Sequence, residues 1–406
     1  MRGTGVSQIC RGVKDPTWRP RESAPYYGST MRIAVNARLL AAQPLEGIGL
    51  YTVAVVRELM RTTNHEWLLI TDRRGALPEF PAAYERVVAY PPARHPLLFY
   101  AWFEWAVPRA LSAWRADAFL SLDNFCSLRA RAPTLLVIHD LAYRHLPGGI
   151  SAVQLAYYRR FMPRFARRAD RLLTVSEFTR RDVARAYGLP AERIGVAYNG
   201  VRARFGRLSP KQITETRRDY TDGQPYFVYV GAVHTRKNVD GLIRGFDRFK
   251  ADTGLPHRLV IAGRMAWQTG PVAEALAQSP SRAHIVTTGY LGADDLGRVI
   301  GAATALALVS LFEGFGVPIV EAFACGVPVV VSDRSSLPEV AGPGGLLVDP
   351  EDTAAVGAAL ARLAADAQLC AQLAAAGAVH AQRFTWEACG RVVSEAIDAL
   401  PRARRD

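Results

Sequence analysis

The stretch SLFEGFGVPIVEAFACGVPVVVSD, residues 310–333, decides how this chain is interpreted. It is largely apolar, yet it contains two glutamates, Glu313 and Glu321. Pro318 suits the first turn of a helix, and Gly326 suits its end, so the middle of the stretch is predicted to be helical. A buried core disfavours carboxylates, and their presence here therefore indicates a functional site.

The start of this predicted helix offers a place to bind a diphosphate. The first N–H groups of a helix lack intrahelical partners, and that end carries a partial positive charge. Glu321, expected in the first helical turn, could accept hydrogen bonds from sugar-like hydroxyls, while Glu313 and the amides of residues 315–317 could bind a second polyol. The plain alternative is an acid that only stabilises the helix dipole.

Short β-rich runs alternate with helical segments on both sides of this stretch. Unbroken Val, Ile and Leu strands between helices indicate parallel sheets that are covered on both faces. The predicted strands are 33–37, 66–71, 86–90, 118–122, 134–140, 171–177 and 194–200 in the first half, and 226–232, 258–263, 284–290, 305–310, 328–332 and 344–350 in the second. The predicted helices include 49–61, 97–111 and one at about 238–250.

This pattern predicts two doubly wound α/β domains, because 406 residues exceed one typical core. Residues 31–203 are expected to form the first domain and 204–383 the second. An amphipathic helix at about 384–400 is expected to pack back on the first domain. Residues 1–30 are polar and aperiodic, and we expect a flexible extension. Ligands bind at the carboxyl ends of parallel strands, so the two sheets should face a central cleft.

The charge of the chain is unevenly distributed. Residues 1–200 hold 28 Lys and Arg against 16 Asp and Glu, a net +12, whereas residues 201–406 hold 22 against 21, a net +1. A basic half suits anionic lipid or a pyrophosphate-linked substrate. Genomic bias explains why only four of the fifty cations are Lys, but not why acids are scarce in one half. Nucleic acid is not expected, because no binding module is recognisable.

One segment, YYRRFMPRFARRAD at 157–170, mixes five arginines with Phe161, Met162 and Phe165. At helical spacing it could lie on an anionic bilayer. It could equally be a packed helix whose arginines stay solvated, and Pro163 interrupts it.

Several classes of protein are disfavoured by simple absences in the sequence. No run of 18 apolar residues is present, so no spanning helix is expected, and the N-terminus lacks the apolar region of a secretory signal. The five cysteines are scattered and show no CxxC spacing, which predicts a reducing compartment without zinc or disulfides. We therefore expect a cytoplasmic protein, either free or at the inner face of the membrane.

The quoted stretch resembles the E-x7-E signature of retaining GT-B glycosyltransferases, the family 4-like, group 1 enzymes, and in particular bacterial mannosyltransferases of surface polysaccharide assembly. Glu313 and Glu321 are eight residues apart, as that signature requires. The resemblance covers Met31 to the C-terminus. It extends to YVGAVHTRKNVDGLIRGF (229–246), LVIAGR (259–264), PEVAGPGGLLVDPED (338–352), VIHDLAYRHLP (137–147), ADRLLTVSEFTRRDV (169–183) and VAYNGV (196–201).

The resemblance implies a GT-B fold of two Rossmann-like domains and transfer of a sugar, with retention, from a nucleotide diphosphate sugar to a hydroxyl group. It implies no cofactor and no metal. GDP-mannose is the expected donor, with UDP-sugars left open, and a glycan linked to polyprenyl diphosphate is the expected acceptor. Two other readings remain: a non-catalytic sugar-nucleotide-binding subunit, and a dinucleotide oxidoreductase. The oxidoreductase hypothesis lacks support, because residues 33–37 are not followed by a GxGxxG motif and an acidic residue that could bind the ribose.

The resemblance also implies roles for single residues. Arg236 and Lys237 match the basic pair that binds the donor diphosphate in the family. Independently of the resemblance, two cations after a strand suit a leaving pyrophosphate. The alternative is an exposed basic loop without a ligand. Glu313 should contact the donor sugar and Glu321 the ribose. His139, which by position alone is more often structural, should lie near the reacting centre. The remaining donor-binding candidates are Gly47, Gly49, Gly231, Gly314, Phe315, Gly316 and Val317, of which Gly47 and Gly49 could equally form a tight turn between the first strand and the first helix.

Overall fold

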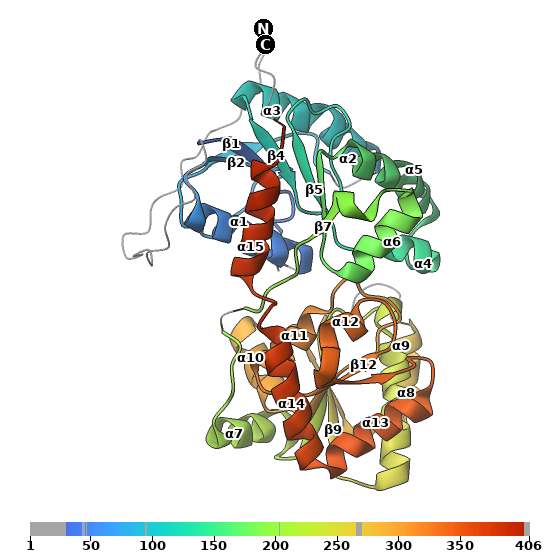
Figure 1. Cartoon of the computed structure of the whole chain (residues 1–406). Coiled ribbons are helices and arrows are strands. Elements are labelled where there is room, and N and C mark those ends of the chain that lie inside the picture. Colours follow the sequence, from blue (N-terminus) through green and yellow to red (C-terminus); the bar gives the residue numbers. More distant parts are fainter. Residues whose placement is uncertain are drawn as a thin grey trace. The chain divides into compact units, whose positions relative to one another are not determined.

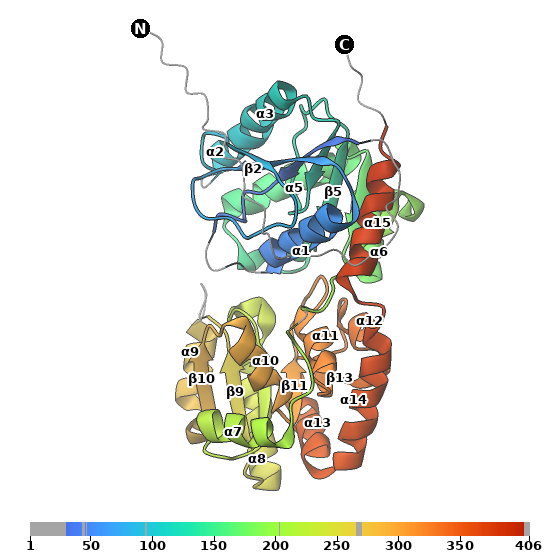
Figure 2. The ribbon, with the colours of Figure 1, turned by 90° about the vertical axis from the view of Figure 1, so that its left-hand side faces the viewer.

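The computed structural model describes residues 30–42, 45, 47–93, 96–202, 204–264 and 270–401. They form two compact units, each shown in Figures 1 and 2. The first unit contains the described residues up to Arg144, Ile150–Asn199 and those from Trp386 onward; the second contains His145–Gly149 and Gly200–Thr385. The sequence predicted the domain boundaries at 203/204 and 383/384. The predicted extension, residues 1–30, lies outside the described residues except for Thr30.

The first unit is built on a parallel sheet. Its strands are β1 (Arg32–Asn36), β2 (Glu66–Thr71), β3 (Glu85–Val88), β4 (Ala118–Ser121), β5 (Thr134–Ile138), β6 (Arg171–Thr174) and β7 (Ile194–Val196). Their order is β3-β2-β1-β4-β5-β6-β7, and every neighbouring pair is parallel. Its helices are α1 (Gly47–Thr62), α2 (Pro96–Ala101), η1 (Trp102–Ala106), α3 (Val107–Trp114), α4 (Ala142–His145), α5 (Ala152–Arg168), α6 (Glu177–Tyr187), η3 (Ala191–Arg193) and α15 (Trp386–Asp398).

The second unit repeats this plan. Its strands are β8 (Tyr226–Val230), β9 (Arg258–Ala262), β10 (Ile285–Gly289), β11 (Ala305–Leu308), β12 (Val329–Ser332) and β13 (Gly345–Val348). They are parallel, in the order β10-β9-β8-β11-β12-β13. Its helices are η2 (Pro147–Gly149), α7 (Pro210–Thr221), η4 (Thr235–Lys237), α8 (Val239–Thr253), α9 (Gly270–Gln278), η5 (Arg282–His284), α10 (Ala293–Gly301), α11 (Val317–Ala324), α12 (Leu337–Ala341), η6 (Gly342–Gly344), α13 (Thr353–Ala365) and α14 (Ala367–Ala381).

The strand order of each sheet reverses direction at one point. In the first unit this point lies between β1 and β4, and in the second it lies between β8 and β11. The β-branched and aliphatic strands next to it are fully buried, as in β11 and β12. In doubly wound sheets ligands bind at the carboxyl ends of the strands at this switch point. The predicted fold class, two parallel-sheet α/β domains, is confirmed.

One predicted helix, 97–111, is divided in the structure. The π-helical turn η1 separates α2 from α3, and the N–H of Val107 donates to the carbonyl of Trp102, five residues back. Pro108 follows, at the start of α3. Its ring has no N–H and crowds the carbonyl four residues earlier, which the wider turn accommodates.

Helix α15 belongs to the first unit, where it lies beside α1 (Figures 1 and 2). A side chain at Gly390 would place its Cβ 2.3 Å from Cγ of Glu58 on α1, so the two helices meet at a position that only glycine fits. The sequence expected such a helix at about 384–400.

Within the described residues, no single helix has both the length and the apolar composition to cross a membrane. One bent pair, residues 353–365 with 367–398 at 102°, meets both criteria only when its two parts are taken together.

Candidate functional site

The chain leaves β8 through a turn that requires glycine. Gly231 has a φ of +146°, which side chains rarely adopt. A Cβ on Gly263, which directly follows β9, would lie 1.8 Å from the carbonyl oxygen of Gly231. The two backbones therefore touch just beyond the ends of neighbouring strands. Gly231 was predicted to bind the donor, and the structure provides a conformational reason for glycine at this position.

Two cations and one carboxylate meet at the switch point of the second sheet. Arg236 and Lys237 lie on η4, after β8, and Glu313 lies on the loop after β11. Nη1 of Arg236 is 3.1 Å from Oε2 of Glu313, and Nζ of Lys237 is 2.5 Å from Oε1. Arg236 also donates to the carbonyl of Phe312 at 2.7 Å. The three charged groups sum to +1, so the cluster retains an attraction for anions.

Glu313 is held as a buried, ionised acceptor. Glu313 is 5 % exposed, and burial by itself opposes ionisation of its carboxyl group. The charges of Lys237 and Arg236, with hydrogen bonds from Lys237 and from Ser310 at 2.8 Å, outweigh that effect and lower the pKa of Glu313 to about 2. Both carboxylate oxygens therefore accept hydrogen bonds at neutral pH.

Two serines after β12 hold the loop that precedes α11. Oγ of Ser335 accepts the N–H of Glu313 at 3.0 Å, and Oγ of Ser336 lies 3.0 Å from the carbonyl oxygens of both Glu313 and Phe315. Ser335 adopts a φ of +59°, an uncommon conformation for a residue with a side chain. Sequence reasoning missed both serines, although applying the strand-end rule to 328–332 would have pointed to them.

The loop Gly314–Gly316 leads into α11 as predicted. Gly316 precedes the helix with a φ of +103°, and a Cβ there would lie 2.7 Å from Leu337. Val317 is the first helical residue and Pro318 the second. The expectation for Glu321 was wrong in one respect: no acid lies in the first turn, and Glu321 comes in the second, because the helix begins at Val317.

Glu321 is almost fully buried and paired with a residue that the sequence did not suggest. It is 1 % exposed, and Nε and Nη2 of Arg202 each lie 2.7 Å from its Oε1. Burial raises the pKa of Glu321, although the charge and hydrogen bond of Arg202 act in the opposite direction. No local sequence signal marks Arg202, which is 119 residues away from its partner.

In the first unit, His139 directly follows β5 and is 8 % exposed. Its Nε2–H donates to the carbonyl of Leu122 at 2.8 Å, since a carbonyl can only accept. The ring meets that of Tyr51 edge-on at 4.8 Å. Burial lowers the pKa of His139, so the imidazole is neutral at pH 7 and Nδ1 carries its lone pair.

The glycines of EGIGLY begin a helix, whereas the sequence offered a tight turn before a helix at 49–61. Helix α1 begins at Gly47, so Gly47 and Gly49 both belong to its first turn. Among the residues that the structure describes, a Cβ on Gly47 would meet nothing within 4 Å, and one on Gly49 would lie 3.2 Å from Leu45.

Sequence reasoning also missed a polar cluster at the switch point of the first sheet. Asp123, 2 % exposed, accepts from Nδ2 of Asn36 at 2.7 Å and from Nε of Arg38 at 2.5 Å. Asn36 ends β1, and Asp123 lies two residues after β4. Polar residues directly after two central strands were the available signal.

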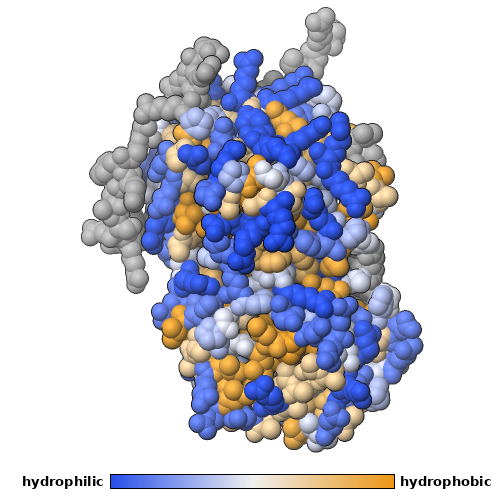
Figure 3. All heavy atoms as spheres, turned by 45° about the vertical axis from the view of Figure 1, so that its right-hand side comes forward, coloured by the Kyte–Doolittle hydropathy of each residue, from blue (hydrophilic) through white to orange (hydrophobic). Residues whose placement is uncertain are grey.

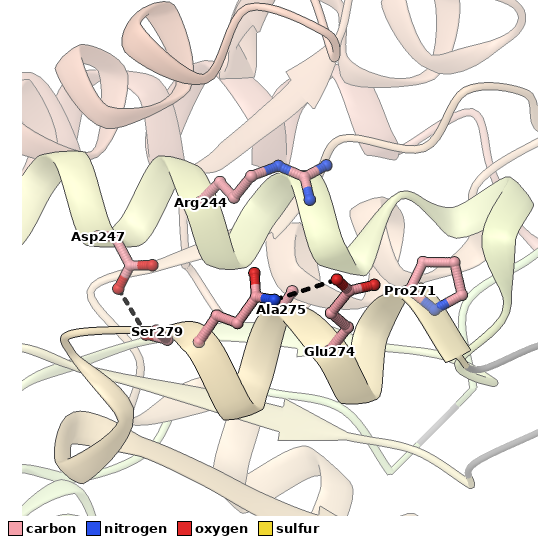
Figure 4. Close-up of a pocket in the computed structure, with 7 residues that line it drawn as sticks. Arg244, Asp247, Pro271, Glu274, Ala275 and Ser279 are labelled. Atoms are coloured by element: carbon pink, nitrogen blue, oxygen red, sulfur yellow. Dashed lines mark hydrogen bonds between the residues drawn. The ribbon is translucent and has the colours of Figure 1, made fainter.

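A pocket of about 320 Å³ lies between α8 and α9 (Figure 4). Its polar groups bind one another: Ser279 donates to Asp247 at 2.6 Å, and Gln278 donates to Glu274 at 3.0 Å. None of the predicted site residues lines it. The pocket is therefore a groove between two surface helices that contains none of the residues at the strand ends.

No group of three or more His, Cys, Asp or Glu side chains within the described residues could hold a metal ion. The four described cysteines, Cys126, Cys325, Cys370 and Cys389, are free.

Two family models match this chain. Residues 45–205 match the model described as Glycosyltransferase Family 4, and residues 212–380 match Glycosyl transferases group 1. O-antigen chain mannosyltransferase B of Escherichia coli is 28 % identical over 361 residues, which cover 85 % of this chain and 94 % of that protein. O-antigen chain mannosyltransferase RfbU of Salmonella typhimurium is 28 % identical over 266 residues, 63 % of this chain and 68 % of its own length.

Solved structures share the fold. Anabaena Alr3699/HepE, crystallised with UDP and glucose, has a TM-score of 0.73 at 20 % identity and covers 91 % of this chain and 100 % of its own. WaaG, a glycosyltransferase involved in lipopolysaccharide biosynthesis, has a TM-score of 0.73 at 15 % identity with the same coverage. At these identities the likeness concerns the fold alone.

Proposed function

Because this chain belongs to the family 4-type, group 1 glycosyltransferases, we propose that it moves a sugar from a nucleotide diphosphate sugar to a hydroxyl group of a glycan acceptor, with retention at the anomeric carbon. The observation that carries the proposal is the cluster of Arg236, Lys237 and Glu313 at the β8/β11 switch point. Two cations suit a leaving diphosphate, and a fixed carboxylate suits the hydroxyls of the sugar beside it.

The cluster suggests how charge is handled during transfer. As the bond between the anomeric carbon and the diphosphate oxygen breaks, negative charge grows on the leaving group, and Arg236 and Lys237 would stabilise it. The acceptor oxygen bonds to the anomeric carbon on the same face, and its proton passes to the leaving diphosphate oxygen. Glu313, whose pKa is about 2, stays ionised and accepts hydrogen bonds from the donor sugar. We assign Glu321 to the ribose and His139 to the donor sugar near the reacting centre.

The test of this assignment compares cations of the same unit. Replacing Arg236 and Lys237 together by Gln should abolish transfer and weaken binding of nucleoside diphosphates. Arg244→Gln is the matched control, because the Arg244 side chain on α8 is 54 % exposed and, among the described residues, its ion-pair partner is Asp240 one turn away. Equal transfer rates in the double variant and the control would overturn the proposal.

GDP-mannose is the proposed donor, since the relatives named above are mannosyltransferases. A UDP-sugar is the alternative, which the UDP complex of the structural neighbour HepE keeps open. A thermal-shift panel of GDP, UDP, ADP and TDP separates them, because a ligand of the native state raises the melting temperature. A chain that binds GDP but transfers from no donor would instead be a non-catalytic binding subunit.

We further propose that transfer needs no divalent cation, because two side-chain cations are in place to balance the diphosphate. Transfer should therefore persist in excess EDTA, and a rate restored only by Mg²⁺ or Mn²⁺ would refute this point. The anomeric configuration of the product, followed by NMR, tests retention.

The proposed acceptor is a glycan carried on polyprenyl diphosphate, met at an anionic membrane surface. In α5 the apolar residues Met162 and Phe165 are buried in the core, so they do not insert into a bilayer. The arginines of the same helix remain available for contact with lipid headgroups, since Arg160 and Arg164 among them are exposed. Trp105 of η1 is 46 % exposed. The face that carries α5 is largely hydrophilic (Figure 3).

Membrane contact would therefore be mainly electrostatic. Sedimentation with vesicles of phosphatidylglycerol should show binding that falls between 50 and about 300 mM salt, as screening predicts. Binding to neutral vesicles alone, or none to either kind, would contradict this contact.

A further inference from the structure

We propose that Arg202 is a positioning residue: it fixes the carboxylate of Glu321 for the nucleotide ribose and ties it to the segment on which the chain passes from the first unit to the second. The inference rests on the proposed function, because it takes Glu321 as the ribose acceptor. It assigns a role to a residue outside the E-x7-E stretch and outside the segments that mark the family in this sequence.

The geometry leaves one oxygen of Glu321 for a ligand. Both guanidinium nitrogens of Arg202 converge on Oε1, each at 2.7 Å. Within the described residues, no hydrogen-bond partner is found for Oε2. A carboxylate with one oxygen anchored and the other available is suited to accept hydrogen bonds from neighbouring hydroxyls.

Arg202 is itself held in place. Its guanidinium lies over the ring of Phe205 at 4.6 Å, and Phe205 is 7 % exposed. The N–H of the preceding Val201 donates to the carbonyl of Phe384 at 3.3 Å. The ring of Phe384 packs edge-on against that of Phe315 at 5.4 Å, in the loop before α11. Arg202 thus has a fixed orientation before any ligand binds.

Two of the places where the chain passes between the units lie next to this part of the second unit in sequence. One passage follows Asn199, and Arg202 lies three residues beyond it; another follows Thr385, which is next to Phe384. Arg202 binds α11 through Glu321, and Phe384 packs on Phe315. Residues close to both of these passages therefore contact residues assigned to the nucleotide.

Removing Arg202 should change the chemical state of Glu321 and not only its position. Glu321 is 1 % exposed, and a buried carboxylate that loses its counter-charge favours the protonated form. A protonated carboxyl carries a donor hydrogen and one weaker acceptor, so the match to vicinal hydroxyls is lost. The nucleotide should then bind as if its ribose lacked those hydroxyls.

The experiment compares GDP with 2′,3′-dideoxy-GDP by calorimetry on the full chain, or UDP with 2′,3′-dideoxy-UDP if the uridine nucleotide stabilises the protein more. We expect Arg202→Gln to weaken GDP about tenfold and to change the dideoxy form less than twofold, so the preference for the ribose hydroxyls disappears. Arg202→Lys, which keeps a charge, should retain part of it. Arg204→Gln is the control, because Arg204 is 70 % exposed and pairs with the exposed Asp294.

The outcomes separate the two claims. If Glu321→Gln leaves the preference unchanged, the ribose assignment of the proposed function fails. If Glu321→Gln abolishes the preference but Arg202→Gln retains it, only the role of Arg202 fails. If Arg202→Gln weakens both nucleotides equally, Arg202 acts through the fold of the site as a whole, and the inference is overturned. Because the readout is a ratio, a lowered melting temperature of the variant does not affect it.

Discussion

The replacement Glu313→Gln tests whether the charged cluster of the second unit is built as described. Gln has the shape of a protonated glutamate, so the variant imitates protonation of this one group. In the native protein the carboxylate accepts hydrogen bonds from Lys237, Arg236 and Ser310. The variant leaves the two half-buried cations without their counter-charge, which should destabilise the second unit.

The magnitude follows from the pKa of Glu313. Its lowering from 4.5 to about 2 corresponds to a preference of about 3 kcal/mol for the ionised form in the folded protein. Because the folded-state pKa lies below the unfolded one, this stability is fully present above about pH 4.5 and is lost as the pH falls toward 2. The variant should therefore lose about 3 kcal/mol at pH 7 but only about 1 kcal/mol at pH 3.

Hydrogen exchange with mass spectrometry measures this loss in the full chain. Peptides from β8 and β11 report the opening free energy of the second unit, while peptides from β1 and β4 report the first unit in the same sample. Glu274→Gln on α9 is the matched control, since Glu274 is exposed and, in the part of the chain that the structure describes, its carboxylate accepts one hydrogen bond, from Gln278. It should change the opening free energy by less than about 0.5 kcal/mol.

Two results would refute the reasoning. One is equal protection of β8 and β11 in the variant and the wild type at pH 7. The other is a difference of the same size at pH 7 and pH 3, which would mean that the loss comes from shape and not from charge.

Two further changes have expected outcomes. Gly263→Ala should lower the free energy of unfolding in urea by about 3 kcal/mol or more, because its Cβ would lie 1.8 Å from the carbonyl oxygen of Gly231. The control Gly292→Ala should lower it by less than about 1 kcal/mol, because no described atom lies within 4 Å of that Cβ. Similar losses in both variants would contradict the described contact. His139 should titrate below pH 6.5 by NMR, because burial lowers its pKa. The native state then favours the neutral ring, so the stability of the protein falls as the pH drops below 6.5. His139→Phe should remove that fall, and it should cost about 1–3 kcal/mol because the carbonyl of Leu122 loses its donor. A midpoint above 6.5 would show that the ring is not buried as described.

Much of the fold could be predicted because its signals are local. The strands around the quoted stretch are short aliphatic runs, and β11, β12 and α11 lie within the predicted ranges. Parallel strands present their carboxyl ends at one edge, so polar residues that follow two neighbouring strands must come close together. That rule, applied to sequence, brings the cations 236–237 and Glu313 together, and the structure places them in contact.

The start of α1 shows where a local rule fails. The two glycines of EGIGLY suggested a turn before a helix at 49–61, but the helix begins at Gly47. Glycine lowers helix propensity by only about 1 kcal/mol, which burial of Tyr51, Val55 and Leu59 from the same helix readily offsets. Local preference was outweighed by tertiary packing.

The sequence by itself determined the alternation of strands and helices, the two doubly wound units and the positions of the charged residues at strand ends, because each of these depends on neighbours within one element. Only the tertiary structure decided which group each charge meets: Arg202 with Glu321, Ser336 with the loop before α11, and Asn36 with Asp123. These partners lie 119, 21–23 and 87 residues apart. Their contacts arise from the packing of whole elements, and no periodicity along the chain encodes such a distance.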